Sequence, residues 1–425
     1  MTHLRRISPW AWIPTLYFAQ GLPYVAVMTV SVIMYKRMGI SNTDIALYTG
    51  WLYLPWVIKP LWSPFVDILR SKRWWTVTMQ WTLAVTFAAV AFLIPTPGFF
   101  SATLAVFWLT AFASATHDIA SDGFYMLALD EHQQSFYVGI RTTFYRVAIV
   151  AGQGGIVVLA GVLERSTGSI PVSWAIAMGA MSGMLLLLAL WHSFILPHPA
   201  TDHTHHTGLT ATRILADFYA TFRSFFQKPG AATAVTFMLL YRLPEAQLVK
   251  LINPFLLDPA SKGGLGLSTA QVGMVYGTVG VIALMAGGIA GGIVAARGGL
   301  KRWIMPMAWA MSLTCATFLY LSIVPDPHLL TVYVCVAVEQ LGYGFGATAY
   351  TLYLIYYAMG PSRTSHYAIA TGFMALGMMI PGMAAGFIQE TLGSYTAFFI
   401  WTMVCCLATI AVASRLRIDP AFGRR

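Results

Sequence analysis

The sequence predicts an all-α integral membrane protein with twelve transmembrane helices in two six-helix bundles and with both termini in the cytoplasm. Three observations support this prediction: the composition, twelve long apolar runs and the distribution of the basic residues. The 425 residues are 58% hydrophobic and only 9% charged, whereas soluble proteins average about 25% charged residues. A water-soluble core is therefore excluded.

Each apolar run is long enough for a spanning helix, which needs about 20 mostly apolar residues. The runs are continuous, whereas a transmembrane barrel would need alternating segments of about ten residues. The first six lie near residues 12–35, 43–66, 75–95, 100–128, 138–163 and 173–196. The second six lie near residues 231–257, 268–295, 303–324, 329–358, 365–390 and 395–413.

A polar stretch separates the two sets of spans. The sequence therefore predicts an N-terminal bundle over residues 1–196, a cytoplasmic linker with an amphipathic helix over 197–230, and a C-terminal bundle over 231–425. Histidines gather in the linker at positions 198, 203, 205 and 206, but no carboxylate or thiol follows at ligand spacing. We expect a solvated linker, and neither a metal site nor a cofactor is predicted.

The basic residues set the orientation. Sixteen of the 25 Lys and Arg residues fall in connections and tails on the side of the termini, and four fall in the opposite loops. Cytoplasmic loops carry an excess of cations, so both termini are predicted to be cytoplasmic. This topology, rather than nucleic-acid binding, explains the net charge of +10. The remaining cations lie within spans: Lys59, Arg141, Arg146, Arg242 and Lys250.

Charges within spans are the first candidates for a functional site, because an unpaired charge at the bilayer centre costs at least about 2.5 to 3.5 kcal/mol. Asp118 and Asp122 lie one turn apart on one face of the fourth span. At about 1.5 Å per residue, Asp118 is level with Arg146 and Asp122 with Arg141. These residues predict a two-rung ladder, with Lys59 at a depth comparable to the lower rung. The ladder is either a structural or gating network or a site for substrate or a proton.

The seventh and tenth spans carry a second group of charges. Pro244 removes a helical hydrogen bond beside Arg242 and Glu245, which opens the local backbone. Glu339 lies near the predicted midplane of the tenth span with no charged neighbour in its own helix. A permanent bridge from Arg242 to Glu339 or Glu245 is one interpretation, and a carboxyl that alternates between pairing and protonation, as in proton coupling, is the other.

Polar residues in the spans complete the predicted binding site. Gln20 and Tyr24 lie one turn apart around a Gly-Leu-Pro break in the first span, where they can hydrogen-bond a polar solute. The predicted substrate contacts are Gln20, Tyr24, Lys59, Arg146, Tyr241, Arg242, Gln340 and Tyr343. The predicted proton-coupling residues are Glu339, Asp118, Asp122 and Glu245.

A repeated motif follows the second span of each half. Residues 63–73 and 292–302 each resemble the loop motif of the major facilitator superfamily, in which Gly, Asp, Arg and Gly precede basic residues. The first copy keeps the acid as Asp67, and the second keeps two glycines but has Ala296 at the acid position. The resemblance implies a gating role at the cytoplasmic hinge for Asp67, Arg70, Lys72, Arg73, Arg297 and Arg302. It also implies transport by alternating access.

A more specific resemblance spans the chain. Residues 20–23, 59–64, 117–122, 241–245 and 339–340 together are similar to the AmpG-like muropeptide permease branch, which also includes acetyl-coenzyme A transporters and siderophore permeases. That branch usually has Gln where this chain has His117, and an Arg three residues after the second acid, where this chain has Tyr125. The chain also ends after twelve predicted spans, without the extra pair of the longer muropeptide permeases.

We therefore expect a multi-pass transporter of the bacterial inner membrane. The predicted function is proton-coupled import of an amino-sugar compound derived from peptidoglycan or chitin. The alternatives are a siderophore or acetyl-coenzyme A permease of the same branch, and a membrane sensor or scaffold that does not transport. No Walker loop or catalytic constellation is recognisable, so an enzyme is not expected. The expected partners are a small polar solute, protons and lipid, without nucleic acid, and the protein is expected to be a monomer.

Overall fold

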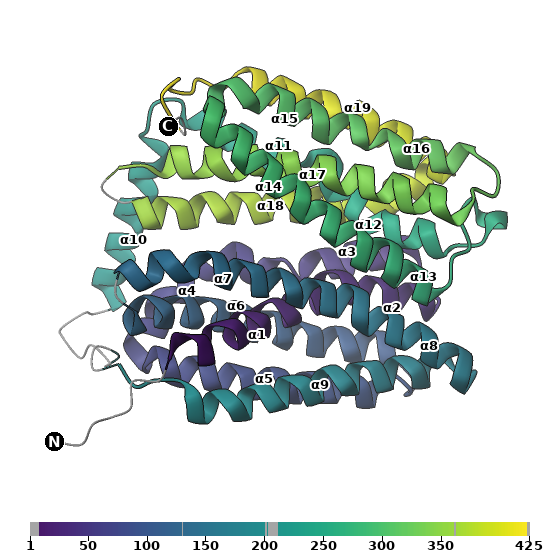
Figure 1. Ribbon diagram of the computed structural model, residues 1–425, viewed down its shortest axis with the longest axis horizontal. Helices are drawn as coiled ribbons and strands as arrows, with labels where there is room; N and C mark the ends of the chain where they lie inside the picture. The colour runs from purple at the N-terminus through teal and green to yellow at the C-terminus, as the bar shows by residue number, and fades with distance from the viewer. Residues whose placement is uncertain (1–7, 130, 200–201, 203–210, 361–362, 423–425) are drawn as a thin grey trace. The chain divides into compact units, whose positions relative to one another are not determined.

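The computed structural model describes residues 8–129, 131–199, 202, 211–360 and 363–422 (Figure 1). Within these ranges the chain is helical between its turns, which confirms the predicted all-α class. Contacts divide it into two compact units. The N-terminal unit joins Met1–Met34 with Ile58–Leu209, and the C-terminal unit joins Tyr35–Val57 with Thr210–Arg425.

The helices of the N-terminal unit begin at the edge of the first apolar run. Short 3-10 and π-helical turns at Pro9–Ala11, Ala26–Val30 and Ala151–Ile156 join some of them. The helices are α1 Ile13–Val25, α2 Ser31–Arg37, α4 Leu54–Leu69, α5 Lys72–Leu93, α6 Phe99–Ala128, α7 Glu131–Val150, α8 Val157–Thr167 and α9 Ile170–Ile195. The last residues of α2 and the first of α4 belong to the other unit.

The C-terminal unit contains the remaining helices. Its irregular helical turns are Ala260–Lys262 and Gly273–Gly280. Its helices are α3 Asn42–Trp51, α10 Ala211–Phe226, α11 Ala231–Leu240, α12 Leu243–Leu257, α13 Thr269–Val272, α14 Val281–Gly298, α15 Leu300–Thr314, α16 Ala316–Ile323, α17 Leu329–Ala358, α18 Arg363–Leu392 and α19 Tyr395–Ser414.

Ten helical stretches in the described ranges are long and apolar enough to cross a membrane. The other two predicted spans are each divided by a turn, one between α3 and α4 and one between α11 and α12. The second break lies at Tyr241 and Arg242, and Pro244 stands in the first turn of α12. Proline is favourable there because the first helical N–H groups have no partner within the helix. Pro244 therefore lies at the start of a new helix, and the helix is interrupted just before it. This interruption agrees with the predicted opening of the backbone.

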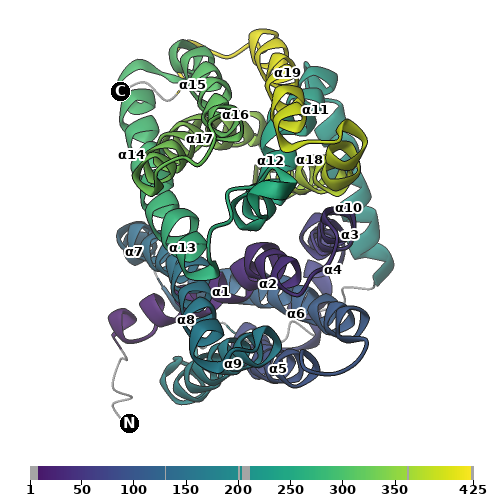
Figure 2. The same cartoon turned by 90° about the vertical axis from the view of Figure 1, so that its right-hand side faces the viewer.

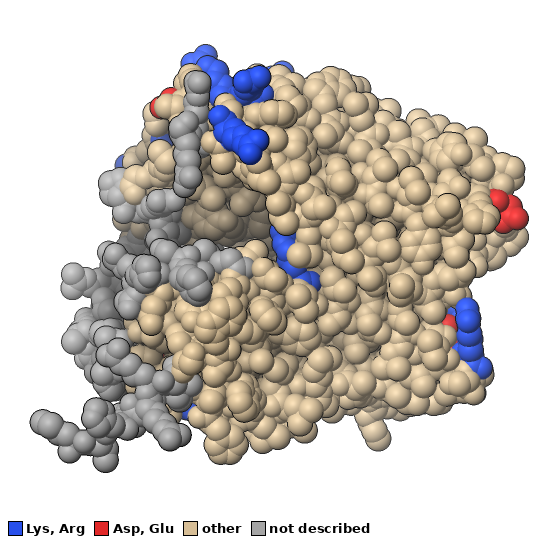
Figure 3. Space-filling model, viewed as in Figure 1, with Lys and Arg blue, Asp and Glu red and all other residues tan. Residues whose placement is uncertain are grey.

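Charged side chains avoid the flanks of the helices. On the face shown in Figure 3, Lys, Arg, Asp and Glu gather mainly near helix ends, and the surface between them is almost entirely uncharged. Large apolar side chains away from the helix ends, such as Leu109, Leu187 and Ile289, are exposed. A surface in contact with the hydrocarbon core of a bilayer has to be largely uncharged, because few groups there can replace the hydration of a charge.

Two sets of helix contacts organise the N-terminal unit. Helix α5 packs between α6 and α9, and α1 packs against α7 (Figure 2). Apolar residues of α1 and α6, including Leu16 and Phe124, form a core with Trp12 and Leu196. This packing places the polar residues of α1, α6 and α7 within reach of one another.

Helix α17 is central to the C-terminal unit, where it packs against α14 and α15. Helix α18 packs against α3, α11 and α12. The segment 35–57 lies in the predicted N-terminal bundle by sequence, but it packs with these C-terminal helices. Glycines permit this close approach, because a Cβ on Gly386 of α18 would lie 2.3 Å from the carbonyl oxygen of Asn42.

A polar network joins the start of α3 to the ends of α12, α18 and α19. Lys36 Nζ lies 2.7 Å from a carboxylate oxygen of Asp258, and the Tyr395 hydroxyl donates to the same oxygen at 2.6 Å. Asn42 Nδ2 donates to the Tyr395 hydroxyl at 2.9 Å and to Gln389 Oε1 at 3.1 Å. These residues line a cavity of about 410 Å³. The network therefore fixes residues 36–42 to three C-terminal helices at the end predicted to face outside.

Close packing between α14 and α17 gives a stability prediction. A Cβ on Gly344 would lie 2.1 Å from the carbonyl oxygen of Leu284, so Gly344→Ala must push the two helices apart. We expect a loss of about 1 to 3 kcal/mol, the usual cost of overpacking, seen as a lower thermal unfolding midpoint of the purified protein. Gly292→Ala on α14 is the control, because its Cβ would meet no atom within 4 Å. Equal midpoints for the two variants would contradict the close contact.

Candidate functional site

The first charge cluster of the N-terminal unit is centred on Asp118 of α6. Lys59 of α4 donates to Asp118 Oδ2 at 2.5 Å, and Gln20 Nε2 of α1 donates to Oδ1. The side chains of Lys59 and Asp118 are 27% and 19% exposed. One carboxylate therefore links three helices, and both charges retain some access to water or solute.

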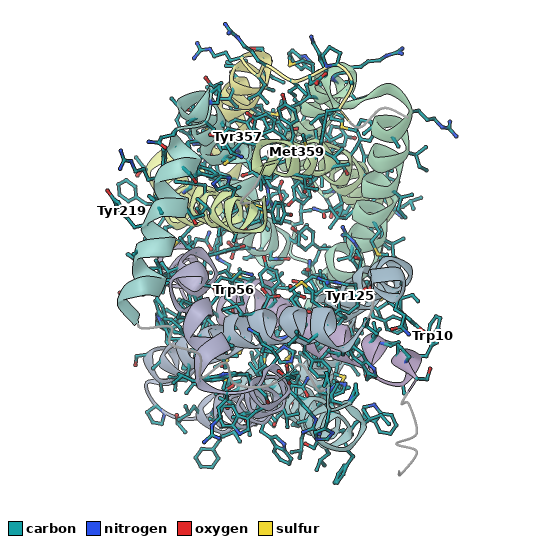
Figure 4. All side chains as sticks on the ribbon, turned by 90° about the vertical axis from the view of Figure 1, so that its left-hand side faces the viewer. Trp10, Trp56, Tyr125, Tyr219, Tyr357 and Met359 are labelled. Carbon is teal, nitrogen blue, oxygen red and sulfur yellow. The ribbon has the colours of Figure 1, made fainter. Side chains whose placement is uncertain are left out.

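The second cluster is centred on Asp122, one turn along α6. Arg141 Nη2 of α7 lies 3.0 Å from Asp122 Oδ1, and the Tyr17 hydroxyl donates to the same oxygen at 3.2 Å. The guanidinium lies over the rings of Tyr17 and Tyr125, 4.5 and 5.0 Å from their centroids. Aromatic faces attract cations, so Arg141 is held by one carboxylate and two rings. Figure 4 labels Tyr125 at this position.

These contacts confirm one predicted rung and correct the other. Asp122 pairs with Arg141, as counting along the spans predicted. Asp118 pairs with Lys59 instead of the expected Arg146. Counting residues gives the depth of a side chain but not the direction in which it leaves its helix, and α4 presents Lys59 to α6 at this depth.

Two aromatic residues of this site were not predicted as functional. Tyr17 lies three residues before Gln20, and Tyr125 lies three residues after Asp122. Residues three apart share a helix face, so this spacing is the signal that could have identified them. The rings of Tyr17 and Tyr125 also meet edge to face, with centroids 5.9 Å apart.

A buried polar chain supports the Asp118 cluster from behind. Gln80 of α5 is hydrogen-bonded to His117 of α6 at 2.9 Å and to His192 of α9 at 2.8 Å. His192 is in turn 2.9 Å from the Thr15 hydroxyl of α1. His117 is adjacent to Asp118, so this chain fixes the rotation of α6 relative to three neighbours. This chain was not predicted, because single polar residues in apolar spans carry no spacing signal.

The C-terminal unit places Arg242 at its helix break. Arg242 precedes the first residue of α12, and its Nη2 donates to the Tyr343 hydroxyl of α17. The guanidinium also lies 5.3 Å from the centroid of the Tyr343 ring. Arg242 Nε is buried without a hydrogen-bond partner. The predicted substrate residues Arg242 and Tyr343 are thus together.

Glu245 and Glu339, two buried acids of this unit, form no ion pair with Arg242 in the described part of the chain. Glu339 accepts a hydrogen bond from Gln340 Nε2 at 2.8 Å through one oxygen, and its other oxygen has no partner. Glu245 Oε2 is also buried without a partner. The expected permanent bridge from Arg242 to Glu339 or Glu245 is therefore absent among these residues, since Arg242 turns toward Tyr343.

Of the other predicted substrate residues, some lie at the charge clusters and others lie in the packed core. Gln20 Oε1 is buried without a partner, although the amide nitrogen donates to Asp118. The ring of Tyr24 lies 6.4 Å from that of Tyr145. Tyr241 is fully buried, and its hydroxyl donates to the carbonyl oxygen of Gly346 at 3.1 Å. The structure therefore places Tyr241 in the packed core instead of beside a solute.

The first predicted gating motif anchors the linker. The backbone N–H groups of Lys72 and Arg73 donate to the carboxylate of Asp202 at 2.7 and 2.9 Å. A carboxylate at the start of α5 is favourable because the first N–H groups of a helix are unpaired and its dipole is positive there. The Arg73 guanidinium donates to the carbonyl oxygens of Ser193 and Leu196 at the end of α9. This motif thus fastens α5, α9 and the linker together.

The remaining gating residues make weaker contacts or none that bear on gating. Arg70 lies 5.7 Å from the centroid of the Trp74 ring, and Arg297 and Arg302 are exposed. The side chain of Asp67 lies outside the described residues. In the adjoining linker, burial and then the neighbouring Arg73 guanidinium lower the pKa of His198 from its usual range.

Lys228 fixes the other end of the linker. Its ammonium donates to the carbonyl oxygens of Tyr357 and Met359, at 2.6 and 2.8 Å, where α17 ends (Figure 4). Cations stabilise the negative end of a helix dipole. Among the described residues no three His, Cys, Asp or Glu side chains are grouped to hold a metal ion. The linker histidines 203, 205 and 206 lie outside these ranges.

Comparison with solved structures identifies the fold. The nucleoside transporter NupG aligns with a TM-score of 0.67 and 16% identity, covering 96% of this chain and 99% of that chain. A D-xylose-proton symporter aligns with a TM-score of 0.68 and 12% identity, covering 97% and 98%. The protein therefore has the fold of the major facilitator transporters, and it is a multi-pass membrane protein.

Comparisons of the sequence show which proteins the chain resembles. Residues 18–169 match the model of the BT1 family. The chain is 28% identical over 405 residues to the anhydromuropeptide permease of Escherichia coli (strain K12), which covers 92% of this chain and 76% of that permease. The predicted resemblance to AmpG-like permeases is thus confirmed. The apolar helices and these bacterial relatives point to the bacterial inner membrane.

Proposed function

We propose that the protein is a proton-coupled symporter that imports a cell-wall- or chitin-derived amino-sugar compound by alternating access. The compound is a muropeptide, an anhydro-muramyl sugar or an N-acetylglucosamine oligosaccharide. The similarity to an anhydromuropeptide permease supports this substrate class. The name of the structural neighbour that moves D-xylose with protons fits a coupled mechanism on this fold.

The observation that carries the proposal is the partly exposed ion pair of Lys59 and Asp118, to which the buried Gln20 donates a hydrogen bond. Charges this far inside predicted spans are costly, and complete burial of an ion pair adds a desolvation penalty that the attraction often does not repay. This cluster instead keeps about a fifth to a quarter of each charged side chain exposed. A solute with acetamido, hydroxyl and carboxylate groups offers both donors and acceptors to such a surface.

The predicted residues take distinct roles in this proposal. Lys59, Arg146 and Arg242 hold an anionic or acetamido group, while Gln20, Tyr24, Gln340 and Tyr343 provide neutral hydrogen bonds. Glu339 or Asp118 carries the coupling proton, with Asp122 and Glu245 as neighbouring acids. The free oxygens of Glu339 and Glu245 support proton carriage, because a buried carboxylate without a cation is costly unless it takes up a proton.

Ligand binding and uptake together test the proposal. Purified protein is heated with N-acetylglucosamine, chitobiose, anhydro-muramyl sugars with and without peptide, acetyl-coenzyme A and siderophores, because a ligand of the folded state raises its stability. We expect a selective shift from an amino sugar and, in proteoliposomes, uphill uptake of that compound driven by an inward proton gradient. A shift from a siderophore or coenzyme ester alone would replace the proposed cargo. Amino-sugar binding without uptake would indicate a sensor.

A further inference from the structure

Lys250 of α12 is a buried cation with few partners. The residue is only 2% exposed. Its Nζ donates to the Thr49 hydroxyl of α3 at 2.8 Å and lies 5.4 Å from the centroid of the Tyr53 ring. All three residues belong to the C-terminal unit. Thr49 of α3 thus presents a neutral hydroxyl to this ammonium, and Tyr53, two residues after the end of α3, presents a ring face, but neither residue carries an opposite charge.

No acid in the described part of the chain forms an ion pair with Lys250. The described pairs are those of Lys36 with Asp258, Lys59 with Asp118 and Arg141 with Asp122. An ammonium has three N–H donors, and Thr49 accepts only one. A single bond to a neutral hydroxyl offsets only part of the cost of burying a charge. Lys250 therefore has unused donors that suit an anion.

Asn253 lies beside Lys250 on the same helix and carries an independent signal. Its side chain is fully buried, and neither Oδ1 nor Nδ2 has a hydrogen-bond partner. Residues three apart in a helix are neighbours on its surface. Buried amides are nearly always hydrogen-bonded, so two unused amide atoms next to an unpaired ammonium require a polar group that the described residues do not supply.

We propose that Lys250 and Asn253 form a subsite that binds a carboxylate of the transported solute. This inference rests on the proposed function, and it identifies the cargo more narrowly as an acidic amino-sugar compound. The Lys250 ammonium and Asn253 Nδ2 donate to the carboxylate oxygens, and Asn253 Oδ1 accepts from an N–H or O–H of the solute. The hydrogen bond to Thr49 of α3 orients the Lys250 ammonium for binding the ligand.

A matched pair of ligands tests the subsite. Binding of 1,6-anhydro-N-acetylmuramic acid and of its methyl ester to the purified full-length protein is measured by titration calorimetry. The ester differs from the acid at one carboxyl group, where a methyl group replaces the negative charge. We expect the wild type to bind the acid about tenfold more tightly than the ester, since charge-assisted hydrogen bonds are the stronger ones. We expect Lys250→Met to lose this preference while it still binds the ester.

Two further variants separate charge from packing. Lys250→Arg should keep part of the preference, and Asn253→Leu, which matches the amide in size, should weaken binding of the acid. Lys262→Met removes an exposed cation of the loop after α12 and should behave as the wild type. A preference for the acid that survives in Lys250→Met would overturn the subsite, as would equal binding of acid and ester by the wild type.

The design distinguishes failure of the subsite from failure of the proposed function. The panel includes a second acid and ester pair without a sugar, a tripeptide and its methyl ester. If only the tripeptide acid binds and Lys250→Met abolishes its preference, the carboxylate subsite stands and the amino-sugar cargo is wrong. If an uncharged amino sugar binds and no acid is preferred over its ester, the cargo class stands and the subsite is refuted. The subsite is also refuted if none of the acids binds.

Discussion

Replacing Glu339 with Gln will abolish uphill accumulation of the substrate and leave counterflow exchange intact. The substitution removes the carboxyl group, one oxygen of which has no partner and can carry a proton. The amide keeps the size of the side chain, and its oxygen can still accept the hydrogen bond from Gln340. Exchange moves substrate without net proton transfer, so it does not need a titrating group at this position. The measurement is uptake of radiolabelled substrate into proteoliposomes, first with an imposed proton gradient and then with substrate on both sides.

Glu390→Gln is the matched control for this experiment. Glu390 is exposed and lines the cavity at the predicted outer end, so its neutralisation should leave both assays unchanged. Proton-driven accumulation that persists in Glu339→Gln would refute the assignment of coupling to Glu339. Loss of accumulation in Glu245→Gln alone would move the coupling role to Glu245.

Lys59→Met will destabilise the protein by about 2 to 4 kcal/mol and abolish transport. The change leaves Asp118 with only the Gln20 amide as a described partner for a carboxylate that is 19% exposed, and removing one member of a buried pair is strongly destabilising. The measurement is the free energy of unfolding in detergent, taken with uptake into proteoliposomes.

The double variant Lys59→Met with Asp118→Asn identifies the cause. It removes both charges, so we expect it to be more stable than Lys59→Met alone and still inactive. Arg415→Met is the control, because Arg415 is an exposed cation at the end of α19 with no predicted role in binding or gating. If the double variant were no more stable than the single one, lost packing and not the uncompensated carboxylate would explain the defect.

Sequence patterns predicted the elements that follow from periodicity and local chemistry. The apolar runs gave the helices, and Pro244 marked the division between α11 and α12. Depth counting placed Asp122 level with Arg141, which pair in the structure. These predictions succeed because length, proline chemistry and distance along a helix are properties of one segment at a time.

Partner choice between helices could not be predicted in the same way. Depth counting gave Arg146 as the partner of Asp118, but in the structure Lys59 reaches this carboxylate from α4. The interpretation of a bridge from Arg242 to an acid is wrong for a related reason. The Arg242 guanidinium donates instead to the hydroxyl of Tyr343, which belongs to another helix. The Gln80 chain was missed since its members come from four separate helices.

The attachment of residues 36–42 to the C-terminal helices also dictates how the protein can be assembled. Asn42 and Gln389 are 347 residues apart in the sequence, so the ribosome releases the first of them long before the second exists. The first half of the second span is therefore inserted into the bilayer before α18, the helix whose Gly386 permits their close contact, has been synthesised. Contacts this distant slow folding and leave a nascent chain open to misassembly. Biogenesis is thus completed only when α18 and α19 are inserted, and a chain truncated before α18 will be a substrate for membrane proteases even though all six N-terminal spans are present.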